Sequence, residues 1–311
     1  MKKIVFLDEY SMSGCDLSRI KALGNYVGYE KTYTTEEVVE RCQDAEIIIS
    51  NKVLVTREAI ERLPKLELIC VAATGVNNID LEAAKERGIP VKNAVGYSTH
   101  AVAETTLGAV LALYRKVGYY DHFVKSGRYA QSDVPFHFGF PTHQLYGKRW
   151  GVIGMGNIGR EVARLASAFG CEVAYTSTSG AVREEVYPAL PLDELLAWAD
   201  IVTIHCPLND RTRGLIGREQ IARMKPSALL VNVARGGIVD EAALVEALDS
   251  DRLGGAAIDV YEKEPMVAGS PLLSIKKSEK LLLSPHNAWS PVEAIEVLIG
   301  CIAENIRTTY E

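Results

Sequence analysis

Short apolar runs alternate with helical patterns along almost the whole chain, and this rhythm limits the fold more than any other feature. One series of strand-like segments covers residues 3–8, 45–50, 66–72 and 89–94. A second series covers residues 149–154, 172–176, 200–205, 228–233, 255–259 and 281–286. Strands that alternate with helices form parallel sheets covered by helices on both faces. The sequence therefore predicts an α/β fold with two doubly wound parallel sheets.

The connection between the two series contains a long helical pattern at residues 101–117, followed by a less regular segment at residues 118–147. In the first series, the stretch "TTEEVVERC" is typical of a helix start. Thr34 and Glu37 have the spacing of a capping box, in which each side chain accepts from the other residue's backbone N–H.

Length, charge and cysteine usage exclude several classes of protein. A chain of 311 residues favours two compact units over the alternative of one large domain. The net charge of −6 and pI near 5.7 argue against a nucleic-acid partner. The N-terminal "MKKIVFLDEY" resembles neither a signal peptide nor a membrane span. The cysteines show no metal-ligand spacing, so we expect no metal site, and we expect reduced core cysteines in a cytoplasmic protein. They are Cys15, Cys42, Cys70, Cys171, Cys206 and Cys301.

The stretch "GVIGMGNIGREVARLASAFG" contains a G-x-G-x-x-G motif after a strand and at the start of an amphipathic helix. Gly154 allows the tight turn, Gly156 lets a pyrophosphate approach the backbone, and Gly159 lets helix and strand pack closely. The helix start offers free N–H groups to phosphates. Glycine turns also occur for packing alone, but the strand–helix–strand context here favours a dinucleotide site.

Candidate site residues follow the predicted strands of the second series. Because the carboxyl ends of parallel strands share one edge, these residues are expected to converge there. Each residue alone could equally be a surface ion pair or a loop histidine, but the set favours an active site. The set comprises Cys206, Pro207, Arg235, Asp259, Glu264 and His286.

Several phrases resemble the D-isomer-specific 2-hydroxyacid dehydrogenases. They are "GVIGMGNIGREVA", "HCPLNDRTRGLIG", "LLVNVARGGIVDEAALVEAL", "GAAIDVYEKEP" and "LLLSPHNAWSP". Within that family, "AATGVNNID", "NAVGYSTHAVAETTLGAVLAL" and "HFVKSGRYAQSD" are similar to the glycerate dehydrogenase and hydroxypyruvate reductase group. The resemblance implies a Rossmann cofactor domain at residues 99–288, inserted in a flavodoxin-like substrate domain at residues 1–98 and 289–311.

The resemblance also implies the reaction, in which NAD or NADP exchanges a hydride with a small 2-keto acid or D-2-hydroxy acid, most simply hydroxypyruvate or glyoxylate. His286 suits proton transfer, because imidazole gains and loses a proton near neutral pH. Glu264 would hold the ring and favour its charged form. Arg235 would clamp the anionic substrate with its fork of donors.

The resemblance extends to the binding residues. The substrate carboxylate is expected at Thr74, Gly75 and Val76, although this loop could also be a structural turn. Arg235 and His286 complete the expected substrate contacts. The expected cofactor contacts are Thr74, Gly154, Gly156, Asn157, Ile158, Gly159, Thr176, Ser177, Thr178, Cys206, Pro207, Ala234, Arg235, Asp259, His286 and Ala288.

The stretch "TSTSG" lacks the acid that usually reads the adenosine ribose of NAD about twenty residues after the glycine loop. An acid at Thr176 would repel the extra phosphate of NADP, whereas hydroxyls serve a ribose or a phosphate. The nearest arginine in sequence is Arg183, which could reach the phosphate or remain a solvated loop charge. We therefore expect weak discrimination between NAD and NADP.

Residues 118–150 are rich in aromatics, which either pack on their own domain or, as the resemblance implies, form a homodimer contact with the preceding helix. They are Tyr119, Tyr120, Phe123, Tyr129, Phe136, Phe138, Phe140, Tyr146 and Trp150. Two other functions suit the same scaffold: a dinucleotide-sensing, corepressor-like protein and a structural oligomer. The presence of Arg235, Glu264 and His286 together favours the enzyme.

Overall fold

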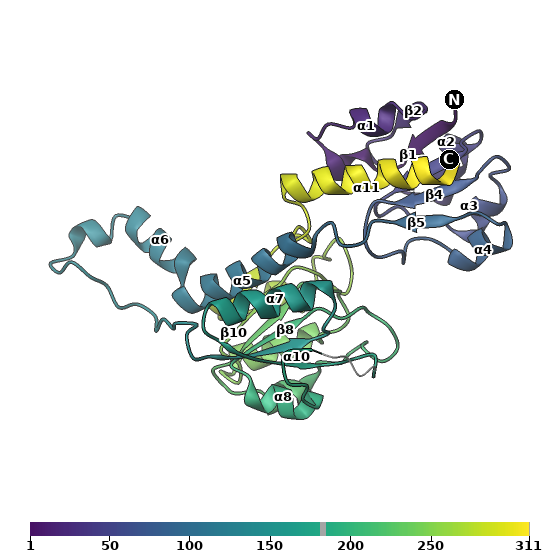
Figure 1. Cartoon of the computed structure of the whole chain (residues 1–311). Coiled ribbons are helices and arrows are strands. Elements are labelled where there is room, and N and C mark those ends of the chain that lie inside the picture. Colours follow the sequence, from purple (N-terminus) through teal and green to yellow (C-terminus); the bar gives the residue numbers. More distant parts are fainter. Residues whose placement is uncertain (181–184, 311) are drawn as a thin grey trace. The chain divides into compact units, whose positions relative to one another are not determined.

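The computed structural model describes residues 1–180 and 185–310, and the chain falls into two compact units. The first unit contains Met1–Ser98 and Ser290–Glu311, and the second contains Thr99–Trp289. Each unit is built around its own parallel sheet (Figure 1). The predicted α/β class with two doubly wound parallel sheets is confirmed.

The sheet of the first unit has the strand order β2-β1-β3-β4-β5, with every pair parallel. This is the flavodoxin-like order. The strands are β1 (Lys3–Phe6), β2 (Asn25–Gly28), β3 (Ile47–Ser50), β4 (Leu68–Val71) and β5 (Val91–Asn93). The sequence indicated all of these except β2, whose four residues are exposed or only half-buried and form no apolar run.

Every residue of β3 and β4 is buried, as expected for strands covered on both faces. The covering helices of this unit include α11, the C-terminal helix of the chain, which packs on β4 (Figure 1). Its helices are α1 (Ser18–Lys21), α2 (Thr35–Cys42), α3 (Arg57–Glu61), α4 (Leu81–Glu86) and α11 (Val292–Tyr310), with the 3-10 turn η1 (Glu9–Met12).

The predicted capping box at the start of α2 is confirmed. The Thr34 hydroxyl accepts from the Glu37 N–H at 3.2 Å, and the Glu37 carboxylate accepts from the Thr34 N–H at 3.2 Å. At the other end of the unit, Asn305 in α11 donates to the carbonyl of Asn93 at 3.0 Å. The C-terminal helix is thereby fastened to β5.

The sheet of the second unit has the order β11-β10-β9-β8-β6-β7, again entirely parallel. All six strands predicted from the second series are present. They are β6 (Arg149–Ile153), β7 (Glu172–Thr176), β8 (Ile201–Ile204), β9 (Leu229–Asn232), β10 (Gly255–Ile258) and β11 (Leu281–Leu283).

One further parallel bridge joins Tyr175 of β7 to Ala189. If this bridge is counted as a minimal third strand beyond β7, the order at that edge becomes 3-2-1-4, as in Rossmann folds. The Tyr175 N–H donates to Pro188 and the Tyr175 carbonyl accepts from Leu190, at 3.0 and 2.8 Å. A single bridged residue gives no apolar run, so the sequence did not reveal it.

Helices cover both faces of this sheet, and the core is divided between two apolar clusters accordingly. One face carries α5 (Thr99–Arg115) and α7 (Asn157–Ala168). The other carries α8 (Leu192–Trp198), α9 (Arg218–Arg223) and α10 (Glu241–Asp249). Short 3-10 turns complete the unit at η2 (Tyr129–Gln131), η3 (Pro271–Ser274) and η4 (Ser278–Lys280).

The expectation of a less regular segment at residues 118–147 is wrong for its first part, because α6 (Val117–Lys125) is a helix. Lys116 precedes it in the left-handed conformation, with φ of 53°, so the chain turns there between α5 and α6. The helical sequence pattern therefore continues from α5 into α6, although the helix axis changes direction at Lys116. In Figure 1, α6 and the chain after it project away from the sheet of the second unit.

The aromatics of this segment differ in how far they are covered. Phe123 stacks on His137 with ring centroids 3.8 Å apart, and the Tyr119 hydroxyl lies 2.9 Å from His137 Nε2. Trp150 belongs to β6 and is fully buried. Phe138 is 87% exposed, and Phe136 is also exposed. The segment thus packs partly on itself and leaves two phenylalanines uncovered.

Two further findings concern the whole described chain. No helix within residues 1–180 and 185–310 is long and apolar enough to cross a membrane. All six cysteines are free. Four are buried, but Cys15 and Cys301 are only half-buried, so the expectation that all six belong to the core is wrong for these two.

Candidate active site

The site is located where the strand order of the second unit reverses. The chain leaves β6 toward β7 on one side and returns as β8 on the other. Open α/β sheets bind ligands at the carboxyl ends of the strands beside such a reversal, which here are β6 and β8. Gly154 and Cys206 meet at this point. A Cβ atom on Gly154 would lie 2.7 Å from the backbone nitrogen of Cys206, and Gly154 has a φ of 97°. Only glycine fits there.

The other two motif glycines differ in what surrounds them. A Cβ on Gly159 would lie 2.2 Å from the carbonyl oxygen of Gly154, so this glycine lets α7 pack on the loop. A Cβ on Gly156 would meet no described atom within 4 Å, and Gly156 has an ordinary extended backbone. Packing within the described residues therefore does not require glycine at 156. A pyrophosphate that approaches the backbone does.

Gly156 is also the N-cap of α7, and no side chain of the described residues caps that helix start. The first N–H groups of a helix have no partner within the helix, and they form a favourable site for phosphate oxygens. Asn157, Ile158 and Gly159 form the first turn. The chain thus offers both the open space and the donors that a dinucleotide needs.

The ends of β7 and β8 are joined by a side-chain hydrogen bond between Thr178 and Cys206. Burial raises the pKa of the Cys206 thiol to about 11, so it stays protonated at neutral pH. Thr176 is buried, and its carbonyl accepts from the Gly154 N–H at 3.0 Å. Pro207 is exposed. Arg183 lies outside the described residues.

His286 follows β11 and lies in the left-handed region, with φ of 53°. Its Nδ1 lies 2.7 Å from Oε2 of Glu264, and its side chain is 20% exposed. The second carboxylate oxygen, Oε1, accepts from the Tyr261 N–H at 3.0 Å. The structure therefore brings Glu264 and His286 together and fixes the carboxylate from its other side.

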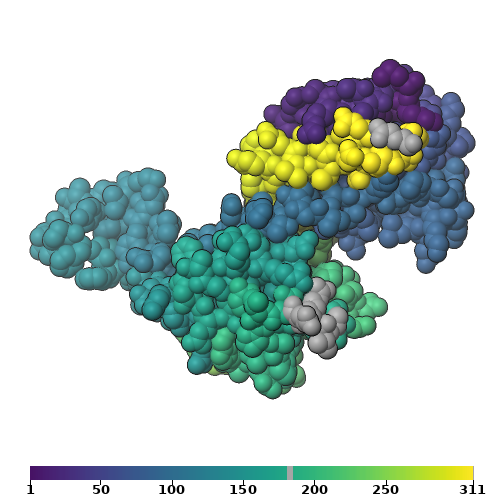
Figure 2. Space-filling view, in the orientation of Figure 1, coloured from purple at the N-terminus to yellow at the C-terminus, as the bar shows by residue number. Residues whose placement is uncertain are grey.

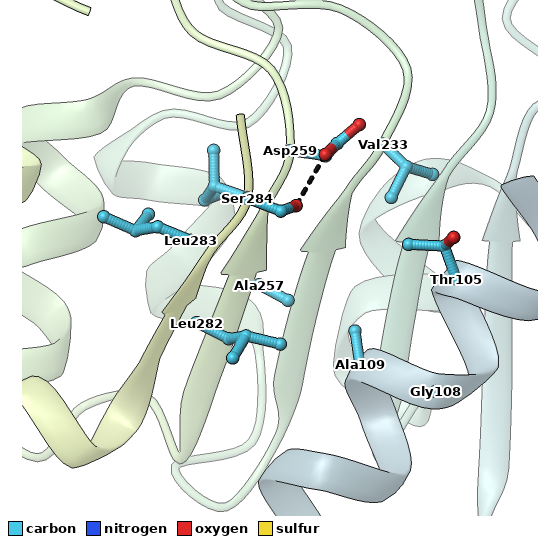
Figure 3. Close-up of a pocket in the computed structure, with 10 residues that line it drawn as sticks. Thr105, Gly108, Ala109, Val233, Ala257, Asp259, Leu282, Leu283 and Ser284 are labelled. Carbon is cyan, nitrogen blue, oxygen red and sulfur yellow. Dashed lines mark hydrogen bonds between the residues drawn. The ribbon is translucent and has the colours of Figure 1, made fainter. Parts of the chain in front are cut away.

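Asp259 organises the segment that carries His286. Asp259 is only 2% exposed. Its Oδ1 accepts from the Ser284 hydroxyl at 2.5 Å (Figure 3). Oδ1 also accepts from the Asn287 N–H, and Oδ2 accepts from the Ala288 N–H, both at 3.1 Å. The carboxylate thus holds the chain on both sides of His286. A cofactor contact of Asp259 stays a prediction.

Tyr261 and Asn232 support the same region, and sequence reasoning missed both. The Tyr261 hydroxyl donates to the Ser284 carbonyl at 2.6 Å, and burial raises the pKa of Tyr261 to about 12, which keeps it a donor. Asn232 ends β9 and is buried. The signal that the sequence offered for Asn232 was a polar residue within the apolar run at residues 228–233.

Arg235 is positioned by the turn that follows β9. Oδ1 of Asn232 accepts from the Ala234 N–H at 3.1 Å, and Nδ2 donates to the Arg235 carbonyl at 2.9 Å. The guanidinium itself donates to the Ala234 carbonyl at 2.7 Å. A Cβ on Gly236 would lie 1.7 Å from the Tyr261 carbonyl oxygen, so the arginine turn packs directly against the chain that leads to Glu264.

The predicted substrate loop belongs to the first unit, where it follows β4. The Thr74 hydroxyl donates to the Ala94 carbonyl at 3.0 Å, and Asn93 donates to the Thr74 carbonyl at 2.6 Å. Gly75 and Val76 come next in this loop. These bonds tie it to the end of β5, so the turn is held within its own unit.

A hollow of about 320 Å³ lies beside the Asp259–Ser284 hydrogen bond, between α5 and the last strands of the sheet (Figure 3). Thr105, Gly108 and Ala109 line it from α5. Across from them are apolar side chains that include Ala257 and Leu282. The hollow is open to the surface and mostly apolar.

Comparison with known proteins identifies the class that this fold and site define. Residues 107–288 match the family described as "D-isomer specific 2-hydroxyacid dehydrogenase, NAD binding domain". The chain belongs to the D-isomer-specific 2-hydroxyacid dehydrogenase family. It is an oxidoreductase that acts on 2-hydroxy or 2-keto acids with a nicotinamide dinucleotide.

Individual relatives cover nearly the same length. The chain is 38% identical to a glycerate dehydrogenase of Methylorubrum extorquens over 309 residues, which covers 98% of this chain and 95% of that protein. It is 35% identical to a hydroxypyruvate reductase of Blautia hydrogenotrophica over 311 residues, with 98% and 96% covered.

Among solved structures, one similar chain is an NADPH-dependent glyoxylate/hydroxypyruvate reductase from Sinorhizobium meliloti in complex with NADP and malonate. Its TM-score is 0.86 at 26% identity, and the match covers all of this chain and 94% of that one.

The different surroundings of the motif glycines give a first prediction. Gly156→Ala adds a methyl group to open space, so the melting temperature should hardly change, while NADH binding weakens by roughly tenfold because overpacking costs about 1–3 kcal/mol. Gly159→Ala forces a methyl against a backbone oxygen and should lower the stability itself by about 1–3 kcal/mol. Thermal unfolding and NADH fluorescence titration measure the two effects. Equal loss of stability in both variants would contradict the assignment of Gly156.

Proposed function

We propose that the chain reduces small 2-keto acids, hydroxypyruvate and glyoxylate first among them, to D-2-hydroxy acids, as a glycerate dehydrogenase does. The carrying observation is the 2.7 Å contact between His286 Nδ1 and Glu264 at the sheet edge that also bears the glycine loop. Relatives with the names glycerate dehydrogenase and hydroxypyruvate reductase support this choice of substrate. When bound, NADH or NADPH supplies the hydride.

In this proposal His286 gives a proton to the substrate carbonyl oxygen during reduction and takes it back during oxidation. Since the Glu264 carboxylate engages Nδ1, Nε2 is the ring nitrogen that exchanges this proton. A carboxylate beside the ring favours its charged form and fixes its orientation. Glu264 is thereby a positioning residue, and His286 is the acid and base.

Arg235 holds the anionic substrate in the proposed reaction. Its guanidinium is half-buried, and its backbone is fixed by Asn232. Arginine presents parallel donors that match a carboxylate, so it orients the substrate as well as attracting it. We further propose that backbone N–H groups at Thr74, Gly75 and Val76 receive the substrate carboxylate.

We assign residues 1–98 and 289–311 as the substrate domain and residues 99–288 as the dinucleotide domain. Thr74, Arg235 and His286 serve both ligands. Weak discrimination between NAD and NADP is proposed because β7 ends without an acid. The remaining proposed cofactor contacts are Gly154, Gly156, Asn157, Ile158, Gly159, Thr176, Ser177, Thr178, Cys206, Pro207, Ala234, Asp259 and Ala288. Free cysteines support a reducing compartment, and we propose the cytoplasm.

Turnover tests the proposal directly. We expect oxidation of both NADH and NADPH in the presence of hydroxypyruvate or glyoxylate, with kcat/KM values for the two cofactors within about two orders of magnitude. His286→Ala should lower kcat by about 10²–10⁴-fold, because general acid–base catalysis is lost. Absorbance at the reduced-nicotinamide band measures both, over a panel of 2-keto acids compared by kcat/KM.

Two results of this assay would contradict the proposal. Quenching of NADH fluorescence without turnover of any 2-keto acid would favour a dinucleotide sensor on this scaffold. A preference for NADH beyond about a thousandfold would contradict weak discrimination, since an absent acid changes the balance by only about 1–3 kcal/mol.

The Glu264–His286 pair predicts an effect on turnover rather than on cofactor binding. Glu264→Gln removes the carboxylate that holds His286 Nδ1 at 2.7 Å, so kcat should fall by about tenfold or more, while NADH affinity measured by fluorescence titration stays within about twofold. The control is Glu262→Gln, which removes an exposed charge two residues away and should leave kcat unchanged. An unchanged kcat in Glu264→Gln would remove Glu264 from the pair.

We also propose a homodimer. The exposed side chains of Phe136 and Phe138 and the apolar hollow beside α5 are surfaces that a second copy would cover. Isologous contacts of this kind reuse the same patch on both copies.

Light scattering at micromolar concentration should give twice the 34.0 kDa chain mass. Phe138→Asp should shift the population toward monomer, because a charge in a closed apolar contact is costly. Tyr33→Asp changes another highly exposed aromatic, in the first unit, and should leave the mass unchanged. A wild-type protein of monomeric mass would overturn the proposal.

A further inference from the structure

Arg211 lies against the end of β7, although it follows β8 in the sequence. Its Nη1 donates to the Ser179 carbonyl at 3.3 Å. Its own N–H donates to the Asn209 side chain at 3.0 Å, and the next residue, Thr212, is buried and donates to the Pro207 carbonyl at 2.7 Å. The turn is thus fixed, and the exposed arginine side chain extends from it toward the segment after Thr176.

The end of β7 is where a dinucleotide fold reads the adenosine ribose. An acid at that point selects the free 2′-hydroxyl, whereas a nearby arginine accommodates a 2′-phosphate. Here the strand ends at Thr176, and the following segment bears hydroxyls. Thr178 is committed to Cys206, and Ser177 lies 3.2 Å from Ser179, oxygen to oxygen. The guanidinium of Arg211 approaches this segment. The last residue of β7 is a threonine, not an acid.

Two described charged side chains near this segment, Glu185 and Arg211, differ in whether an opposite charge pairs with them. Glu185 is the first acid described after the segment, its side chain is 8% exposed, and it accepts from Arg160 at 2.6 and 3.0 Å. Its negative charge is therefore compensated by the first turn of α7. Within the described residues, Arg211 pairs with no carboxylate, and its bond to Ser179 is a long one to a neutral acceptor. A phosphate would be the stronger partner.

An arginine that only satisfies a loop carbonyl is the simpler explanation of the same contact. Arg213 provides the comparison, because it is exposed on the same turn, and its guanidinium lies near Gly237 rather than at the end of β7. Both residues carry the same charge, so a general electrostatic effect would involve both. A phosphate contact would involve Arg211 alone.

We propose that Arg211 binds the 2′-phosphate of NADP(H) and is the residue that lets this enzyme accept NADP(H) beside NAD(H). The inference rests on the proposed function of the glycine loop as a dinucleotide site. It assigns the phosphate to a residue of the turn after β8, 32 positions from Ser179 in the chain. Arg183, the candidate nearest in sequence to Thr176, is the competing assignment.

The test is equilibrium binding of four ligands, NADPH, NADH, 2′,5′-ADP and 5′-AMP, to the full chain by calorimetry. Arg211→Ala should weaken NADPH and 2′,5′-ADP by about tenfold or more and leave NADH and 5′-AMP within about twofold. Arg211→Lys should recover part of the loss, since it keeps the charge without the fork of donors. Arg213→Ala should change none of the four affinities, and unchanged melting temperatures would show that the variants are folded.

Two outcomes separate this inference from the function on which it rests. If Arg211→Ala leaves 2′,5′-ADP binding unchanged, or if Arg183→Ala alone weakens it, the assignment of Arg211 is overturned while the dinucleotide site stands. If the wild-type protein binds neither NADH nor NADPH, the proposed function itself fails. Equal weakening by Arg211→Ala and Arg213→Ala would also overturn the assignment, because it would show a general charge effect.

Discussion

The buried carboxylate of Asp259 is the interaction on which the site depends most. A charge so deeply buried is tolerated only when hydrogen bonds satisfy it, and here Ser284, Asn287 and Ala288 all donate to it. Each such bond to a charged group contributes about 1.5–3 kcal/mol. These donors lie on both sides of His286 in the chain. The hydrogen bonds that satisfy the buried carboxylate therefore also hold the backbone around His286, which is in the left-handed conformation.

The same logic joins the neighbouring strand ends into one edge. Asn232 fixes the arginine turn after β9, and the glycine at 236 lets that turn lie against the Tyr261 carbonyl. Tyr261 then reaches Ser284 with its hydroxyl and Glu264 with its N–H. Arg235, Glu264 and His286 follow three different strands. The arginine turn packs against Tyr261, Tyr261 donates to Glu264, and Glu264 contacts His286. The edge is therefore set by buried polar groups rather than by the side chains for which we propose a catalytic role.

The sequence predicted what apolar periodicity and parallel topology determine. The six strands of the second unit, the capping box at Thr34 and the proximity of Glu264 to His286 all follow from residue pattern and from the shared edge of a parallel sheet. The strand β2 and the bridge at Ala189 were missed, because exposed or single residues leave no pattern. The contact between Arg211 and Ser179 was missed for a different reason: the two residues are 32 positions apart in the chain, and only the fold of the turn after β8 brings them together.

The glycine motif shows how structure separates requirements that a sequence pattern combines. Gly154 is needed because Cys206 approaches its backbone, and Gly159 because the helix approaches Gly154. Both requirements exist without any ligand. Gly156 has an ordinary backbone and open space where its side chain would be, so nothing described within the protein demands it. Gly156 stands at a helix start that no described side chain caps, and this is the part of the motif for which a bound phosphate would supply the reason.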